Sequence, residues 1–359
     1  LISQIAVAQQ KQMSLEDAVY GRYTYLQPTA LNDVLWQTDE VFSVVDNNIL
    51  WLESVKGSKI KLLSLDELKS VLGIEFPYFP MHSWLNQDEL LLQTSEKFYV
   101  FNPKEKKVNF KIDLPEHAAN AIFNYDGKYA AFTKGDDLFL AFANGEIKQI
   151  TSDGGNGIVN GQTVHRNEFG ISNGIFISPN GNFIAFYRKD ESMVKDYPLV
   201  DYMAREAEYT PVKYPMAGMK SHQVKLGVYS IATGKTIFLN SGEPLDHYLT
   251  NVAWAPDEKM IYMAEVNREQ NQMQLNAYDV LSGEKVKSLF EEKSDTYVEP
   301  MFPIQFSKVN TNEFYYLSAE RLGPRLIYDV DQLEYVHVGW QGEYAVQVLA
   351  QNKEVEVLG

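Results

Sequence analysis

The sequence predicts an all-β fold, a β-propeller of four-stranded blades with one projecting arm. Three observations predict it: a loosely repeated strand pattern, a high aromatic content, and turns rich in Asn, Asp, Gly and Pro. Hydrophobic residues make up 45% of the 359 residues and aromatic residues 13%, a mixture that suits half-buried strands better than helices. This length allows either two domains or one large all-β domain.

The repeated unit recurs about every 40–80 residues, the spacing typical of propeller blades. In each unit an apolar residue precedes a polar turn, a short apolar strand follows, and an alternating strand leads through a second turn into a last strand. Asn180-Gly181 and Ser282-Gly283 supply the positive φ values that tight hairpins need. Blades stacked around an axis bury both of their faces and leave only short edges. Six copies occur, at 36–65, 84–112, 123–151, 176–188 with 225–239, 254–290 and 305–320.

A seventh unit begins at residues 343–359, so about six to seven blades are expected. A propeller that ended there would expose a strand edge and an apolar face. We therefore expect either more chain than these 359 residues or an unusual pairing of the last strands. The predicted organisation is one propeller over residues 14–359, preceded by a signal-peptide remnant or a disordered terminus over residues 1–13.

Two segments interrupt the repeats. Residues 64–75, LSLDELKSVLGI, carry Leu and Val at helical spacing and predict a short amphipathic helix that packs on the rim. The longer insert, residues 189–223, contains three prolines, several tyrosines and charges of both signs. It is too apolar for a free linker, so we expect an arm that docks on another surface.

Composition excludes several classes of function. The net charge of −16 would repel a phosphate backbone, so no nucleic-acid partner is expected. The absence of cysteine excludes disulfides, cysteine nucleophiles and thiolate zinc sites. Ala6-Val7-Ala8 follows apolar residues and resembles a signal-peptidase site, which predicts a periplasmic, secreted or cell-surface protein; the alternative is an ordinary frayed terminus. No run of about 18 apolar residues occurs, so no membrane-spanning helix is expected.

The sequence contains no recognisable catalytic machinery. It lacks a phosphate-binding loop, a dinucleotide fingerprint and a His-Glu-x-x-His motif, so no cofactor or metal is predicted. The pattern Gly-x-Ser-x-Gly occurs as GISNG at 170–174, but it is not expected to form the nucleophile elbow of an α/β-hydrolase. The carboxylate pairs Asp136-Asp137 and Glu291-Glu292 are typical of turns or solvated faces rather than of an acid–base pair. Six histidines are scattered singly and favour structural roles: His82, His117, His165, His222, His247 and His337.

Glu168 is the one candidate site residue that the chemistry singles out. It precedes a strand that is expected to run near the propeller axis, where a partly desolvated carboxylate needs a cationic or hydrogen-bonding partner. The α-ammonium of a peptide would serve. Arg166 or Lys189 would serve equally, in which case Glu168 forms only a structural ion pair.

Several long stretches resemble the propeller domain of prolyl peptidases related to dipeptidyl peptidase IV, and among these most closely the prolyl tripeptidyl aminopeptidases of Bacteroidetes. The resemblance is dense over about residues 160–320 and looser before them. The matching stretches are VHRNEFGISNGIFISPNGNFIAFYRKDESMVKDYPLVDY (164–202), PVKYPMAGMKSHQVKLGVYSIATGKT (211–236), TNVAWAPDEKMIYMAEVNREQNQMQLNAYDVLSGE (250–284) and YVEPMFPIQF (297–306).

The resemblance implies an eight-bladed propeller that caps a C-terminal α/β-hydrolase domain carrying a Ser-Asp-His triad. This second domain is missing from these 359 residues, so the chain alone is expected to be inert. Propeller carboxylates would bind the free amino terminus of a peptide that is cut after proline. The dipeptidyl relatives use a Glu-Glu pair whose places are held here by Arg166 and Asn167, whereas the tripeptidyl relatives use the next position, here Glu168.

The resemblance also implies a substrate-binding set of Glu168, Asn167 and Arg166, and a dimer formed through the arm at 189–223; the alternative is an arm folded back on its own blade. The chain would gate substrate and anchor its amino terminus in a secreted serine exopeptidase that releases di- or tripeptides. The segment SAERLGPRLIYDVDQLEY (318–335) departs from the family pattern and leaves the register of the sixth unit open. Two alternatives remain: a stand-alone propeller that binds a protein or glycan, and a pseudo-enzyme with a decayed triad.

Overall fold

The computed structural model describes residues 13–27, 32–308, 310–318, 323–329 and 336–337. It divides into two compact units, each of which is treated separately. The first comprises Leu1–Thr94 with Tyr99–Phe110, and the second comprises Ser95–Phe98 with Lys111–Gly359. Antiparallel sheets dominate, and the described helices are short: α1 (Leu15–Val19), α2 (Leu65–Leu72) and the 3-10 segments η1 (Gly21–Tyr23) and η2 (His165–Gly170).

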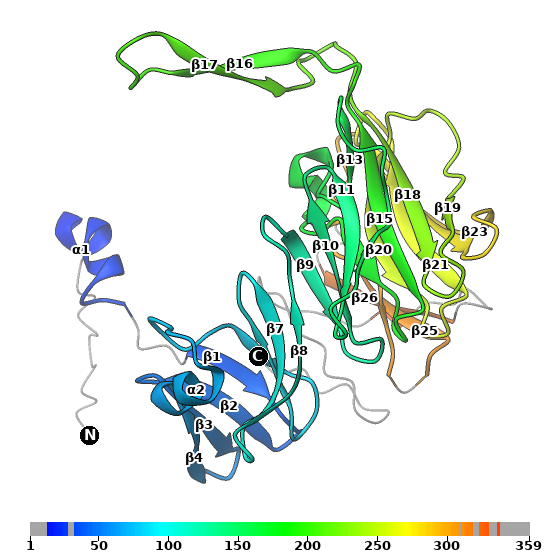
Figure 1. Cartoon of the computed structure of the whole chain (residues 1–359). Helices are drawn as coiled ribbons and strands as arrows, with labels where there is room; N and C mark the ends of the chain where they lie inside the picture. Colours follow the sequence, from blue (N-terminus) through cyan, green and yellow to red (C-terminus); the bar gives the residue numbers. More distant parts are fainter. Residues whose placement is uncertain (1–12, 28–31, 309, 319–322, 330–335, 338–359) are drawn as a thin grey trace, which may run out of the picture. The chain divides into compact units, whose positions relative to one another are not determined.

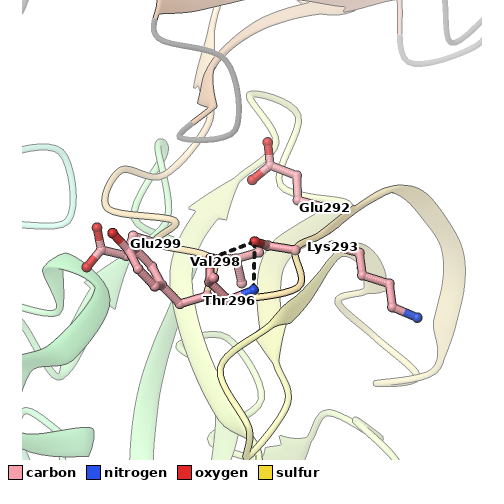
Figure 2. Close-up of a pocket in the computed structure, with 7 residues that line it drawn as sticks. Glu292, Lys293, Thr296, Val298 and Glu299 are labelled. Carbon is pink, nitrogen blue, oxygen red and sulfur yellow. Dashed lines mark hydrogen bonds between the residues drawn. The ribbon is translucent and has the colours of Figure 1, made fainter.

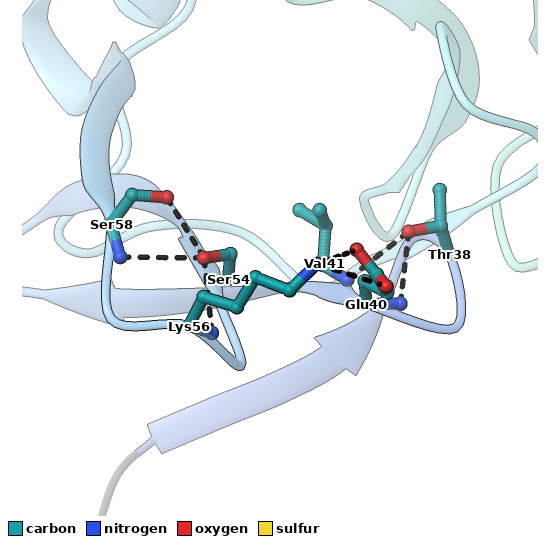
Figure 3. A network of polar contacts seen from close by, with 6 residues as sticks. All are labelled: Thr38, Glu40, Val41, Ser54, Lys56 and Ser58. Carbon is teal, nitrogen blue, oxygen red and sulfur yellow. Dashed lines mark hydrogen bonds and ion pairs between the residues drawn. The ribbon is translucent and has the colours of Figure 1, made fainter.

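The first unit holds one complete four-stranded sheet and most of a second. Its strands are β1 (Asn32–Trp36), β2 (Val41–Asp46), β3 (Ile49–Ser54) and β4 (Lys59–Ser64), then β5 (His82–Trp84), β6 (Leu90–Gln93), β7 (Lys97–Asn102) and β8 (Lys107–Asp113). The Trp84 Nε1–H group donates to Ser43 Oγ at 2.9 Å and ties the two sheets together. At one end of the first sheet, Lys56 pairs with Glu40 at 3.1 Å (Figure 3); both side chains are well exposed, so the pair stabilises little.

Helix α2 confirms the helix predicted at 64–75. The hydroxyl of Ser64 accepts from the backbone N–H of Glu67, and the Glu67 carboxylate accepts from the backbone N–H of Ser64, so the first turn is capped in both directions. Gly73 ends the helix in the left-handed region, where a residue without Cβ fits without strain. Leu65 and Leu68 are buried in the core between the two sheets.

The second unit holds the remaining sheets, and adjacent strands in each are antiparallel. Together with the first two, these sheets follow the six predicted repeats in order and confirm the all-β class. Each has the predicted four strands except the sheet of β13, β14, β15, β18 and β19, which has five. The predicted seventh unit lies outside the described residues. The strands are β9 (Ala119–Asn124), β10 (Tyr129–Lys134), β11 (Asp137–Phe142), β12 (Ile147–Gln149), β13 (Ile158–Asn160), β14 (Ile175–Ile177), β15 (Phe183–Asp190), β18 (Gln223–Ser230), β19 (Thr236–Phe238), β20 (Tyr248–Trp254), β21 (Met260–Val266), β22 (Gln272–Asp279), β23 (Lys285–Lys293), β24 (Gln305–Phe306), β25 (Glu313–Ser318), β26 (Gly323–Asp329) and β27 (Val336–His337).

Polar groups in the turns join neighbouring sheets of the second unit. Tyr129 donates its hydroxyl to the carbonyl of Gly181 at 3.0 Å, from the β9–β12 sheet to the next. Glu258, in the turn between β20 and β21, is only 6% exposed and accepts from the backbone of Asn180 and the side chain of Asn182, both at 2.7 Å. The polar turns at residues 180–182 and 256–259 therefore do more than reverse the chain, because they join three successive sheets of the second unit.

The arm is a two-stranded hairpin, β16 (Asp196–Asp201) and β17 (Glu208–Lys213), which extends beyond the ends of β15 and β18 (Figure 1). All six residues of β16 are exposed, and the tip residue Tyr202 is 88% exposed. The hairpin lies within the predicted insert at 189–223. The first two residues of that insert nevertheless belong to β15, where Lys189 and Asp190 pair with β18.

Candidate functional site

The predicted site residues lie on a tight loop, η2, between β13 and β14. His165, Arg166, Asn167, Phe169 and Gly170 have φ values from 51° to 72°, in the left-handed region, while Glu168 alone is extended. Non-glycine residues are strained in that region by roughly 1 kcal/mol or more each. The surrounding structure must therefore hold this loop in place, and such strain is typical of functional loops. Glu168 lies in this kinked loop, which leads into β14, so its predicted place in a loop before a strand is confirmed.

Two buried side chains hold the loop on β20. His165 is 4% exposed, and its Nε2 accepts from the backbone N–H of Leu249 at 3.2 Å. Phe169 is 7% exposed; its carbonyl accepts from Thr250 Oγ1 at 3.0 Å, and its ring lies edge-on against Tyr248 at 5.1 Å between centroids. Between these two anchors, residues 166–168 are exposed. The loop thus presents three consecutive side chains from a fixed base.

His165 and His222, which are 57 residues apart in the sequence, form a buried hydrogen-bonded pair, in agreement with the structural roles predicted for the histidines. Their ring nitrogens, His165 Nδ1 and His222 Nε2, are 3.0 Å apart. Because His165 Nε2 accepts from a backbone N–H, its Nδ1 carries the proton and donates to His222. Burial, together with the charge of Lys189, lowers the pKa of His222 to about 4, and burial together with the neighbouring His222 lowers the pKa of His165 well below its usual value. Both rings are neutral at pH 7.

Glu168 is solvent-exposed and not partly desolvated, contrary to the prediction. Its Oε2 accepts from Gln270 Nε2 at 2.6 Å, and within the described ranges it makes no ion pair. Lys189 pairs with Glu191 at 2.8 Å. The guanidinium of Arg166 donates to the carbonyl of Lys213 at 2.9 Å instead. Neither cation that could have made Glu168 a structural ion pair therefore contacts it.

The three predicted site residues do not converge. The guanidinium of Arg166 lies 4.3 Å from the ring centroid of Tyr214, at the base of the arm, whereas the Glu168 carboxylate contacts Gln270. Asn167 is exposed beside Glu168, and its backbone N–H donates to the carbonyl of Val164 at 3.0 Å. The structure therefore leaves Glu168 and Asn167 at the exposed part of the loop and assigns Arg166 to the arm.

Sequence reasoning missed the turn that faces this loop. Residues 267–271, between β21 and β22, carry Gln270 and also Arg268, whose Nη1 donates to the hydroxyl of Tyr248 at 2.7 Å. Arg268 is half-buried and has no carboxylate partner among the described residues. Only the unusual density of polar residues in NREQNQ signals this turn in the sequence. Nothing in that pattern identifies a partner about 100 residues away.

A cavity of about 450 Å³ lies next to the same turn (Figure 2). The backbone N–H of Val298, one of its lining residues, donates to the carbonyl of Gln270 at 2.8 Å. Glu292 corrects the prediction of a solvated pair at 291–292, because it is 2% exposed and accepts from Tyr316 and Ser318. The cavity is lined by Glu292, Lys293, Ser294, Thr296, Tyr297, Val298 and Glu299.

The described residues contain neither a metal-binding cluster nor a membrane-spanning helix. Within these ranges no three His, Cys, Asp or Glu side chains are grouped closely enough to hold a metal ion. No helix in the same part of the chain has the length and apolar character that a membrane span requires.

The fold and this loop define a propeller domain of the peptidase-associated type. Residues 85–351 match the family described as dipeptidyl peptidase IV (DPP IV) N-terminal region, and the chain belongs to that family. A Talaromyces marneffei protein named probable dipeptidyl-aminopeptidase B is 31% identical over 76% of this chain and 37% of its own length. A Chaetomium globosum protein of the same name is 30% identical over 47% of this chain and 20% of its own length.

Solved structures agree on the fold. A Bacteroides ovatus protein described as a candidate dipeptidyl aminopeptidase IV superposes with a TM-score of 0.76 at 38% identity, over 84% of this chain and 43% of that one. Porphyromonas gingivalis dipeptidyl peptidase 4 superposes with a TM-score of 0.70 at 21% identity, over 94% and 50% of the two chains. The chain thus spans half or less of the length of these relatives. The predicted family and the propeller fold are confirmed, and the tripeptidyl subgroup stays a prediction.

Proposed function

We propose that this chain is the substrate-gating propeller of a serine exopeptidase that releases di- or tripeptides after proline, and that Glu168 binds the α-ammonium of the substrate. The observation that carries the proposal is an exposed carboxylate held by a neutral donor, with no cation on it within the described residues. A full unit of negative charge is thereby available to a guest. The match to the N-terminal region of dipeptidyl peptidase IV supports the association with a peptidase.

The anchor would act as a ruler. A hydrolase domain would cut after proline, while the ammonium of the peptide meets the Glu168 carboxylate. The distance between the two points would then select the number of residues released. Asn167, exposed beside Glu168, is placed to donate to a peptide carbonyl, and Arg166 would act indirectly by holding the loop.

We also propose that the protein forms a homodimer through its arm and that it is exported. A second copy of the chain would cover the arm, which exposes Tyr202 and Met203 by 88% and 82%. Deletion of residues 196–213 should convert a dimer into a monomer in sedimentation velocity. Export to the periplasm or cell surface rests on Ala6-Val7-Ala8, which lies outside the described residues.

The test is Glu168→Gln in the full-length enzyme that carries this chain. In the proposed complex the bound peptide would exclude water from the pair, and loss of one member of such a desolvated charge pair lowers binding by about 2–5 kcal/mol, so kcat/KM on chromogenic X-X-Pro and X-Pro peptides should fall at least about 30-fold. The matched control is Glu291→Gln, because Glu291 is also exposed and also accepts from glutamine side chains. The control should retain full turnover. Unchanged turnover by Glu168→Gln would refute the anchor.

A further inference from the structure

Among the described residues, Gln270 donates a side-chain hydrogen bond to Glu168, and it lies on a turn that several hydrogen bonds make rigid. The side-chain oxygen of Asn267 accepts from the backbone N–H groups of Asn271 and Gln272, both at 3.0 Å. The side-chain amide of Asn267 donates to Asn271 Oδ1 at 2.7 Å. Gln270 itself has a φ of 59°, a left-handed conformation that is strained for a residue with a Cβ. Strain retained by a stiff turn indicates that the position of this side chain matters.

The turn is also hydrogen-bonded to the cavity wall and to Tyr248 of β20. The carbonyl of Gln270 accepts from Val298, on the cavity wall, at 2.8 Å. Arg268, two residues earlier, donates to the hydroxyl of Tyr248, whose ring packs on Phe169 of the anchor loop. The Gln270 side chain and the Glu168 carboxylate are therefore held by one connected set of contacts and approach each other from fixed bases.

We propose that Gln270 is the positioning residue of the Glu168 anchor: it holds one carboxylate oxygen, turns the other toward the peptide ammonium, and leaves the negative charge uncompensated. This inference rests on the proposed function. A carboxylate has about four acceptor sites, of which the single bond from Gln270 Nε2 takes one. A lysine or arginine at position 270 would neutralise the charge that has to attract the substrate. A glutamine orients the carboxylate and carries no charge of its own at any pH.

A positioning role and a purely structural role of Gln270 lead to different effects of substitution. If Gln270 only stabilised the turn, then any substitution that preserves the turn would leave substrate binding unchanged. If it positions Glu168, then the charge at position 270 controls the affinity for a free amino terminus. The effect then appears in KM and not in kcat, and it disappears for peptides whose amino terminus is acetylated.

Two substitutions in the full-length enzyme test the proposal. Gln270→Lys should pair with Glu168 and raise KM for free-amino peptides roughly tenfold or more, with kcat within about twofold. Gln270→Glu should place a like charge beside Glu168, so the acid limb of kcat/KM should move up by about one pH unit. The other charged or titratable groups on the loop, the turn and the segments packed against them are present in both wild type and variant: His165, Arg166, Lys189, His222, Arg268, Glu269 and Glu299.

Gln272→Glu is the matched control, because Gln272 Nε2 makes the same bond to a different exposed carboxylate, Glu291, at 2.9 Å. This control should match wild type in KM and in its pH profile. Wild-type KM in Gln270→Lys would overturn the inference, while a loss in Glu168→Gln would still uphold the anchor. If both variants keep wild-type turnover, the proposed function itself fails. If Gln270→Lys does not fold, the pH profile of Gln270→Glu decides: a shifted acid limb supports the inference and an unshifted one overturns it.

Discussion

Two carboxylates in turns of the second unit are held in opposite ways. Glu258 is 6% exposed and accepts from Asn180 and Asn182 of the preceding sheet, both at 2.7 Å. Burial alone would raise the pKa of Glu258, but the hydrogen bonds from Ser178, Asn182 and Asn180 hold it below its usual value. Glu168 is exposed and accepts one hydrogen bond, from Gln270.

The comparison of Glu258 with Glu168 shows how the same kind of side chain can stabilise the fold at one turn and remain available to a ligand at another. A carboxylate whose acceptor sites are filled by the protein serves as a fastener between sheets and has nothing left for a ligand. A carboxylate with one neutral donor keeps its charge and most of its acceptor sites. The loop that presents Glu168 has a strained backbone, and the contacts of His165 and Phe169 with β20 offset that strain. Glu168 itself has an extended conformation and does not contribute to the strain.

The largest expected effect tests the shape of the anchor loop. A Cβ on Gly170 would meet the carbonyl oxygen of Met301 at 2.1 Å, at a φ of 72°. Gly170→Ala should therefore lower the free energy of unfolding by about 3–5 kcal/mol, from backbone strain and overlap together. The control is Gly218→Ala, which has a φ of 75° but open space, and which should lose about 1 kcal/mol. Equal losses in urea unfolding would show that the Met301 contact does not restrain the loop.

The second prediction separates the two regions by pH. Because the folded pKa of His222 lies near 4 and that of an unfolded histidine near 6.5, the unfolded state takes up the proton first as the pH falls. Stability should drop between pH 6.5 and pH 4 by on the order of 3 kcal/mol. Glu258 has a lowered folded pKa, so its contribution should be lost only below about pH 4.5, the usual value for glutamate. Urea unfolding of His222→Gln should show a smaller first loss, because the lowered pKa values of His165, His247 and His82 still contribute to it, and should retain the second.

The third prediction compares the two carboxylates directly. Glu258→Gln places an amide NH2 among donors from Asn180 and Asn182, so the free energy of unfolding should fall by about 2 kcal/mol. Glu168→Gln removes the charge of an exposed side chain, and its stability should change by no more than about 0.5 kcal/mol. Urea unfolding of both variants measures the difference. Similar losses in the two would mean that Glu168 is also a structural carboxylate.

Local pattern was enough to predict the sheets. Strand alternation and the turn residues of SPNGN and APDEK fixed the six repeats, and the spacing of Leu65, Leu68 and Leu72 fixed helix α2. These features depend on residues close together in the chain, where periodicity and capping chemistry act directly. The sequence also singled out Glu168, because a charge before an apolar run requires an explanation.

The rest of the site depends on contacts between distant residues. Gln270 is 102 residues from Glu168, and His222 is 57 residues from His165, so no local pattern relates them. The left-handed conformations of His165, Arg166 and Phe169 run against the preference of each residue and are imposed by packing on β20. For the same reason the direction of the Arg166 side chain could not be predicted: its target, Tyr214, belongs to the arm.

The smallest expected effect concerns that contact between loop and arm. The guanidinium of Arg166 donates to the Lys213 carbonyl and lies over the Tyr214 ring, an exposed cation–π contact that contributes about 0.5–1 kcal/mol. Arg166→Ala should therefore leave global stability nearly unchanged, while amide hydrogen exchange at residues 164–170 and 211–215 should become roughly two- to fivefold faster, because both segments lose a shared restraint. The control is Arg205→Ala, near the tip of the arm, which should change neither segment. Faster exchange at residues 211–215 alone would show that Arg166 does not restrain the loop. The contacts of His165 and Phe169 with β20 would then be sufficient to hold Glu168 in its exposed position.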